Sequence, residues 1–264
     1  MGNYINKIRK KYKETGKKSL LIYLILRFLV ILCMVMQILR GDLNNAFLCV
    51  LSLILFTVPT FIQEKFKITL PTLLESIIYM FIFSAEILGE INNFYGIIPH
   101  WDTVLHTING FLAAGIGFSL IDILNQNSKN GNLSPVFVAI VAFCFSMTIG
   151  VLWEFIEYTG DIYLKFDMQK DTIVNSISTV YLEPESKNKA VIVNNIENVK
   201  LITNGNEIII ENGFLDIGLH DTMKDLIVNF IGAFVFCIIG FLYIINREKY
   251  KFAINFIPIK DKVD

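Results

Sequence analysis

Six apolar segments separated by polar stretches constrain the fold of this chain more than any other feature. A helix needs about 20 apolar residues to cross the hydrocarbon core of a bilayer, and each segment has, or nearly has, that length. The hydrophobic share of 54% and the mean hydropathy of +0.55 exceed the usual values for a soluble chain. The sequence therefore predicts an all-α fold, a polytopic membrane helix bundle of about six transmembrane helices. We place them at Leu20–Leu39, Ala46–Ile62, Thr69–Leu88, Trp101–Leu124, Pro135–Glu157 and Met223–Ile245.

Basic residues gather at both ends of the chain and predict its orientation. Positively charged flanks stay on the cytoplasmic side, whereas the loop 89–100 contains no Lys or Arg. We therefore expect both termini in the cytoplasm, with Lys65, Lys67 and Lys129 in cytoplasmic loops. The first apolar segment is too long for a signal peptide and predicts an uncleaved helix. The terminal basic residues are Lys7, Arg9, Lys10, Lys11, Lys13, Lys17 and Lys18, then Arg247, Lys249, Lys251, Lys260 and Lys262.

The predicted spans divide the chain into five parts. These are a basic cytoplasmic segment (1–19), transmembrane helices 1 to 5 (20–157), an extracytoplasmic loop with a small β-rich insertion (158–220), transmembrane helix 6 (221–245) and a cytoplasmic tail (246–264).

The long loop carries the signal of a β-hairpin. Two apolar runs, Val199–Thr203 and Glu207–Glu211, flank Asn204-Gly205-Asn206. Asn and Gly tolerate the positive φ angles of a tight hairpin turn. The run Val191–Val193 predicts a third strand.

Three polar clusters lie at the predicted outer ends of the fourth, fifth and sixth spans. Ionisable side chains are costly at membrane depth, so they usually mark a site. Spacings of three or four residues place the polar members of each cluster on one helical stripe. We expect these stripes to converge, with Glu86 of the third span at the same level. The clusters are Trp101-Asp102-x-x-x-His106, Trp153-Glu154-x-x-Glu157-x-x-x-Asp161 and His220-Asp221-x-x-x-Asp225-x-x-x-Asn229.

Five carboxylates would meet at such a site, with Lys224 as a nearby cation. Uncompensated anions are unstable there, so either several carboxylates are protonated or a cation binds among them. Carboxylate and imidazole ligands suit a divalent ion such as Zn, Mn, Fe or Mg. The predicted metal ligands are Asp102, His106, Glu154, Asp221 and Asp225, with His220 or His100 as further nitrogen ligands. The catalytic candidates are Glu154, Glu157, Asp225 and His106, supported by Asn229, His220 and Glu86.

Some polar residues also have a structural interpretation. Asp221 is placed to cap the sixth helix. Asp122 is expected to be solvated at the inner end of the fourth span, and Arg27 and Glu75 to snorkel or to pair with each other. Small residues beneath the clusters predict close helix contacts. These are Gly110, Ala114, Gly115, Ser146, Gly150, Gly232 and Ala233.

Several site classes lack their sequence signals. The four cysteines are scattered through apolar segments, so they indicate neither a disulfide framework nor a thiolate metal site. A nucleotide-binding loop, a nucleophile elbow and an H-E-x-x-H motif are all missing. The basic N-terminus favours contact with anionic headgroups of the lipid bilayer rather than with nucleic acid.

The three clusters resemble motifs of the YjdF-like bacterial membrane proteins, a family of unknown function, and at longer range those of the VanZ-like family. Trp101-Asp102-Thr103-Val104-Leu105-His106 is similar to the VanZ-like D-K-x-x-H-F. The segment 150–157 is similar to G-x-x-x-E-x-x-Q, with Glu157 at the Gln position, and the segment 221–233 to D-x-x-x-D-x-x-x-N-x-x-G-A. The resemblance implies a bacterial cytoplasmic membrane and supplies no reaction. It implies that Asp102, His106, Glu154, Asp225 and Asn229 occupy motif positions.

Two functions fit these observations. The first is a metal-assisted enzyme of the outer leaflet that acts on an envelope lipid or a lipid-linked precursor. The second is a non-catalytic envelope protein that binds a cation, an amphiphile or a partner, as in VanZ-like glycopeptide tolerance. A cation or proton transporter is less favoured, because only Glu75 and Asp122 continue a polar path across the membrane and no inverted repeat is visible. The sequence indicates no oligomeric state.

Overall fold

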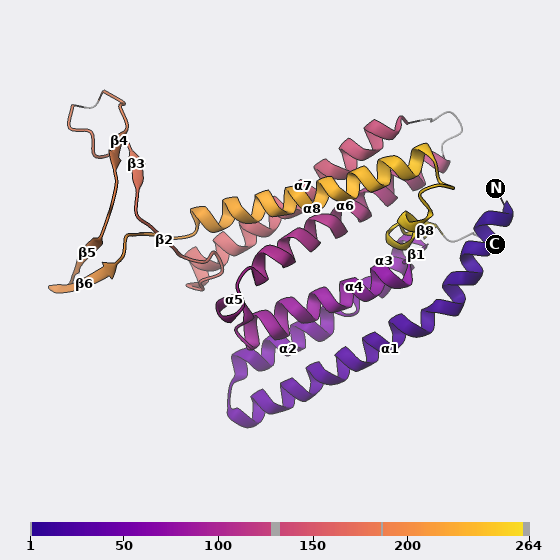
Figure 1. The fold of residues 1–264 in the computed structure, drawn as a ribbon. Coiled ribbons are helices and arrows are strands. Elements are labelled where there is room, and N and C mark those ends of the chain that lie inside the picture. Colours follow the sequence, from indigo (N-terminus) through magenta and orange to yellow (C-terminus); the bar gives the residue numbers. More distant parts are fainter. Residues whose placement is uncertain (1, 128–132, 186, 261–264) are drawn as a thin grey trace. The chain divides into compact units, whose positions relative to one another are not determined.

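Helices dominate the structure, a computed structural model that describes residues 2–127, 133–185 and 187–260 (Figure 1). Among these residues, six helical stretches are long and apolar enough to cross a membrane, which confirms the predicted fold class. They are Lys18–Arg40, Leu43–Phe66, Thr72–Ile91, Trp101–Asn125, Pro135–Leu164 and Leu219–Ile245.

The chain divides into two compact units. The helical unit contains residues 1–150 and 225–264, and the second unit contains residues 151–224. The helices are α1 (Gly2–Arg40), α2 (Leu43–Leu55), α3 (Val58–Phe66), α4 (Thr72–Phe83), α5 (Phe94–Ile97), α6 (Trp101–Asn127), α7 (Pro135–Thr159) and α8 (Leu219–Ile245), with π-helices η1 (Ser84–Ile91) and η2 (Gly160–Leu164) and the 3-10 helix η3 (Lys251–Phe256).

The second span is longer than predicted and consists of two helices. Asp42 precedes it and accepts a hydrogen bond from the backbone N–H of Asn45 at 3.0 Å, so the helix begins earlier than Ala46. Pro59 in the first turn of α3 cannot donate a backbone hydrogen bond, which accounts for the break between α2 and α3. Lys67 then adopts a left-handed conformation with φ of 51° and ends α3.

Aromatic rings join α1, α2 and α4. Tyr79 lies with its ring centroid 5.2 Å from that of Tyr23 and 5.8 Å from that of Phe56, which is fully buried. Arg27 donates a hydrogen bond to the hydroxyl of Tyr23. The carboxylate of Glu75 accepts hydrogen bonds from Gln63 Nε2 at 3.1 Å and from the Tyr79 hydroxyl at 3.4 Å. The expected pair of Arg27 and Glu75 is therefore wrong, because each side chain bonds to other neighbours.

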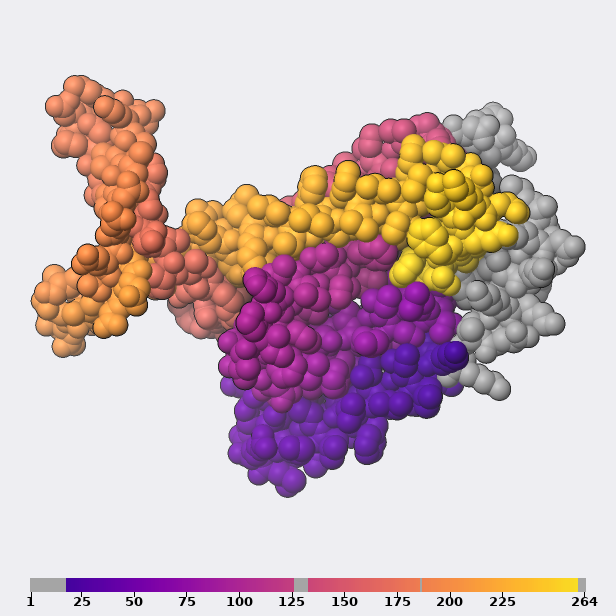
Figure 2. Space-filling model, in the orientation of Figure 1, coloured from indigo at the N-terminus to yellow at the C-terminus, as the bar shows by residue number. Residues whose placement is uncertain are grey.

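The C-terminal tail folds back onto the helices instead of trailing away from them. Strand β8 (Ile259–Lys260) pairs antiparallel with β1 (Ile68–Thr69), and η3 contacts α4. Ala253 of η3 is fully buried in a cluster that includes residues of α6, α7 and α8. Figure 2 shows these yellow C-terminal residues covering one end of the helices drawn in magenta and violet.

Asp122 is buried, contrary to the expectation that it is solvated. The residue is 5% exposed, and Arg247 Nη2 donates to its Oδ1 at 2.9 Å and to its Oδ2 at 3.3 Å. The tail brings Arg247 to this position, which spacing along α6 does not indicate. Lys129, Lys262 and the side chains of the first 17 residues lie outside the described part of the chain.

The second unit contains three pairs of short antiparallel strands. Strand β5 (Asn198–Thr203) pairs with β6 (Asn206–Glu211) around Asn204 and Gly205, whose φ angles are 49° and 78°. The predicted hairpin is thus confirmed. The predicted third strand, β4 (Val191–Val193), exists but pairs with β3 (Ile177–Thr179), while β2 (Thr172–Val174) pairs with β7 (Phe214–Asp216).

Candidate functional site

Helices α6 and α8 approach each other closely at two glycines. A Cβ atom built on Gly110 would lie 2.1 Å from the backbone oxygen of Asn229, and one built on Gly232 would lie 2.0 Å from the backbone oxygen of Thr107. Real Cβ atoms do not come so near to a backbone oxygen. The predicted contact through small residues is therefore confirmed at these positions.

Asn229 is fully buried between α6 and α7. Its side-chain amide faces Gly150, where a Cβ would lie 2.7 Å from Nδ2, and its Oδ1 accepts a hydrogen bond of 3.4 Å from Asn109. Ser146 of α7 donates to the backbone oxygen of Gly110 at 2.8 Å. Polar groups and glycines thus hold the three helices together about one turn from Asp225.

Asp102, His106 and Asp225 form a compact group at one end of α6 and α8, which we name the Asp-His-Asp group. His106 Nε2 lies 3.3 Å from Asp102 Oδ1 and 3.7 Å from Asp225 Oδ2. One ligand atom from each residue lies within 4.8 Å of the other two. Asp225 is 1% exposed and His106 is 9% exposed, so water has little access to their charges.

The spacing of the Asp-His-Asp group is compatible with one shared metal ion. Charge-assisted N–H···O bonds are about 2.7–2.9 Å long, and both distances from Nε2 exceed this range. Two ligands that lie about 2.0–2.1 Å from a zinc ion at tetrahedral angles are separated by about 3.3–3.4 Å. The observed distances of 3.3 Å and 3.7 Å are close to that separation.

Glu154 and Glu157 lie on the part of α7 that belongs to the second unit. Glu154 is 5% exposed and follows Gly150 by one helical turn. Glu157 is 8% exposed, and its Oε1 accepts a hydrogen bond of 2.7 Å from the indole Nε1 of Trp153. The tryptophan is therefore a direct partner of one predicted catalytic carboxylate.

Asp161 and Asp221 bind the backbone of one loop. Met168 and Gln169 donate their backbone N–H groups to Asp161 at 2.6 Å and 2.9 Å, and Lys170 donates its own to Asp221 Oδ2 at 2.8 Å. Both carboxylates therefore position the chain after η2, which is a structural role that fits a buried anion.

The expectation that Asp221 caps the last helix is wrong. Helix α8 begins at Leu219, two residues earlier, so Asp221 lies inside the first turn. Asp216, three residues before the helix, bonds to its first turn instead: its Oδ2 accepts the backbone N–H of His220 at 2.8 Å. The side chain of His220 is exposed, and Glu86 lies half-buried in η1. Among the described residues, the group able to share one metal ion contains neither of them.

Asn109 is a polar contact that the sequence interpretation missed. It lies three residues after His106, so it shares a helical face with that side chain, and it reaches the predicted supporting residue Asn229. Extending the stripe from Asp102 and His106 by one more turn would have found it.

Residues 20–246 match the family of predicted membrane proteins called DUF2238. The chain belongs to this family. The match confirms the resemblance to YjdF-like membrane proteins, and the description of the DUF2238 family names no activity. A stretch of 100 residues, 36% of the chain, is 33% identical to an uncharacterised protein of Thermotoga maritima and spans half the length of that protein. No solved structure matches the chain.

Proposed function

We propose that this DUF2238 protein is a membrane-embedded, metal-dependent enzyme whose Asp-His-Asp group binds one divalent cation. The observation that carries the proposal is the convergence of Asp102 Oδ1 and Asp225 Oδ2 on the same nitrogen, Nε2 of His106. An imidazole nitrogen without its proton can bind a metal ion, and so can both carboxylates. A divalent cation compensates both carboxylates at once and accepts the nitrogen lone pair.

The ligand set narrows the choice of metal. Two carboxylates and one imidazole suit Zn, Mn, Fe or Mg rather than a metal that prefers thiolates. Three protein ligands also leave at least one coordination position for water or substrate, as in catalytic rather than structural zinc sites. When bound, such a metal polarises a carbonyl or phosphoryl oxygen and makes a bound water more acidic.

The position of the group indicates the class of substrate. Asp102 begins α6 and Asp225 lies near the beginning of α8, so the Asp-His-Asp group lies near the end of two candidate spans. The distribution of basic residues favours the extracytoplasmic side for that end. An enzyme there meets envelope lipids and lipid-linked precursors, and hydrolysis or group transfer on such a molecule is the proposed reaction. Among the predicted catalytic residues, Glu154 is the proposed proton-transfer group.

A second candidate function is a non-catalytic envelope protein that binds an amphiphile or a partner, in line with the VanZ-like resemblance. The observation that favours it is one face of the β5–β6 hairpin, which carries four apolar side chains. Two of them, Leu201 and Ile208, are about half exposed. Transport is less favoured, because Asp122 is bonded to Arg247 and Glu75 to Gln63 and Tyr79.

Elemental mass spectrometry of detergent-purified protein tests the metal site. We expect a near-stoichiometric divalent metal in the wild type and its loss in Asp225→Asn and His106→Ala, because each change removes one ligand. His220→Ala is the matched control, since it removes an exposed imidazole from the first turn of α8.

The thermal unfolding of each variant is measured alongside. A variant that stays folded and retains the metal contradicts the proposal, as does a folded wild type that takes up no Zn, Mn, Fe or Mg when each ion is supplied. Loss of metal from Asp225→Asn with full occupancy in His220→Ala supports it.

A further inference from the structure

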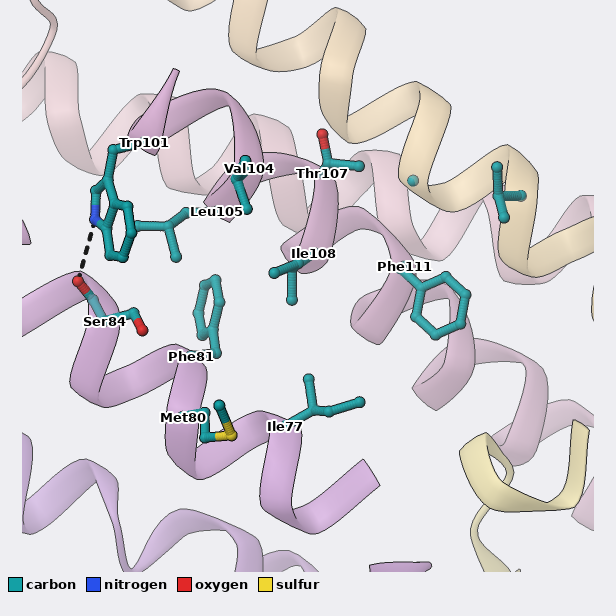
Figure 3. A pocket seen from close by; sticks show the side chains of 12 residues that line it. Ile77, Met80, Phe81, Ser84, Trp101, Val104, Leu105, Thr107, Ile108 and Phe111 are labelled. Carbon is teal, nitrogen blue, oxygen red and sulfur yellow. Dashed lines mark hydrogen bonds between the residues drawn. The ribbon is translucent and has the colours of Figure 1, made fainter. Parts of the chain in front are cut away.

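An apolar groove with a volume of about 450 Å³ lies between α4 and η1 on one side and α6 and α8 on the other (Figure 3). On α6 its lining extends from Trp101 to Phe111, and Ile77 and Phe81 of α4 face these residues. Gly232 and Val235 contribute the wall from α8. The groove belongs wholly to the helical unit.

The groove and the Asp-His-Asp group lie on different sides of α6. Residues 104, 108 and 111 recur at spacings of three and four along the groove, whereas Asp102 and His106 form another stripe of the same helix. The groove is thus a separate site, and its occupancy does not depend on a metal.

Both ends of the groove are closed by side-chain contacts. At one end the Trp101 indole Nε1 donates to the backbone oxygen of Ser84 at 3.3 Å, and its ring packs edge-on against Phe94 with centroids 5.1 Å apart. At the other end Phe111 packs edge-on against Phe236 and Phe256, with centroids 5.1 Å and 5.2 Å apart. The opening is therefore lateral, along a helical surface that spans the membrane.

The lining offers carbon atoms and almost no hydrogen-bonding groups. The Trp101 indole is bonded to Ser84, and the Thr107 hydroxyl donates to the backbone oxygen of Thr103 at 2.7 Å. Met80, Val104 and Val235, which border the groove, are each about half exposed. An occupant therefore gains van der Waals contacts with the walls and few hydrogen bonds, which suits a hydrocarbon chain.

The length of the groove corresponds to one leaflet. Phe111 lies ten positions after Trp101 on α6, which at a rise of 1.5 Å per position is about 15 Å, half of the ~30 Å hydrocarbon core. The groove begins at the first residue of the α6 span, where tryptophan commonly marks the membrane interface. A chain that lies along the groove from its Trp101 end therefore reaches about the middle of the bilayer.

The charges at the Trp101 end disfavour an anionic headgroup. The sequence contains no Lys or Arg between Lys67 and Lys129, so η1, α5 and α6 supply no such cation. The same stretch supplies Glu86 and Glu90 of η1. A headgroup that carries an amine is compatible with these carboxylates, whereas a net negative headgroup is repelled.

We propose that this groove binds one acyl chain of a zwitterionic, amine-bearing bilayer phospholipid from the leaflet at the Trp101 end. The site is distinct from the proposed metal centre and places an ordered lipid between α4 and α6.

Fluorescence quenching by brominated phospholipids tests the proposal. The chain has two tryptophans, so Trp153→Phe leaves Trp101 as the sole emitter. The protein is reconstituted in vesicles that contain a small fraction of phosphatidylethanolamine with brominated acyl chains. Quenching of the Trp101 emission should reach most of its maximum at a low fraction of this lipid and should then saturate. Brominated phosphatidylglycerol should quench only in proportion to its bulk fraction.

Val235→Phe fills the groove, and Val50→Phe adds the same bulk to the exposed surface of α2. The Val235→Phe protein should lose the saturable quenching, and the Val50→Phe protein should keep it. Equal saturable quenching in both overturns the groove as the binding site, and equal quenching by the two headgroups overturns the headgroup selection.

Native mass spectrometry of full-length wild type should show one retained phosphatidylethanolamine that Val235→Phe lacks. Retention of the lipid by that variant contradicts the proposal, and this result does not depend on tryptophan fluorescence.

Discussion

Gly110 of α6 lies directly against the backbone carbonyl of Asn229 of α8, with no room for a Cβ atom between them. This contact lies about one helical turn from the Asp-His-Asp group on each helix, since His106 precedes Gly110 by four residues and Asp225 precedes Asn229 by four. The distance between the two helices at the glycine therefore controls the distance between the side chains of the Asp-His-Asp group.

Replacing Gly110 by alanine should damage both stability and metal binding. The new methyl group would lie 2.1 Å from the Asn229 oxygen, so α6 and α8 must separate, at a cost of about 1–3 kcal/mol. Gly115→Ala is the control, because the nearest atom to its Cβ is a flexible Phe236 ring atom at 3.1 Å. Thermal unfolding and metal content are the measurements, and equal behaviour of both variants would contradict the expectation.

Replacing Glu154 by glutamine should leave metal content and abundance unchanged and should abolish turnover, because the amide has the same shape but cannot accept the proton. Mass spectrometry of lipids and lipid-linked precursors in cells that produce wild type or variant is the measurement. Glu90→Gln, at an exposed position, is the control. If cells that produce Glu154→Gln show the same change in a lipid or precursor as cells that produce the wild type, this carboxylate is not the proton-transfer group.

Breaking the ion pair between Asp122 and Arg247 should destabilise the helical unit. Arg247→Met leaves the buried carboxylate without this cation, and we expect a loss of about 1–3 kcal/mol because the arginine side chain is still 35% exposed. Lys251→Met is the control, since Lys251 lies 3.7 Å from Glu248 in an exposed pair and its loss should change little. Thermal unfolding in detergent compares the two, and an equal loss in both would contradict a special role for Asp122.

The contribution of Asp171 to the stability of the second unit should become more favourable as pH falls. Partial burial raises the pKa of Asp171 first, and repulsion from Asp167, Asp161 and Asp216 raises it further. A raised carboxyl pKa means that folding favours the protonated form. Its stabilising contribution is full below the ordinary carboxyl pKa and is lost as pH rises through the folded-state pKa.

Asp171→Asn should remove this pH dependence. Hydrogen exchange of residues 167–175 in the full-length protein, corrected for the intrinsic rate at each pH, is the measurement. Because Asp171 is exposed, the change in protection should stay within about threefold. An identical pH profile for wild type and variant would show that the repulsion has no effect on folding.

Local patterns predicted the elements of this protein well. Segment length and apolarity sufficed for the six spans, because a bilayer accepts only helices of about that length with satisfied backbones. The hairpin was predictable because the turn at Asn204 and Gly205 needs positive φ, which those two residues tolerate. The pairing of Asp102 with His106 follows from their spacing on one helix.

The sequence by itself determined which segments are helices, which ends carry polar stripes, and that glycines permit close packing. Only the tertiary structure decided that Asp225 joins Asp102 and His106 while Asp161 and Asp221 bind loop backbone, and that Arg247 reaches Asp122. The physical reason is that spacing fixes neighbours along one helix within a turn, whereas contacts between helices depend on crossing points such as Gly110 against Asn229. The apolar groove likewise has no sequence signal, because it is a space that exists only once α4, η1, α6 and α8 pack together.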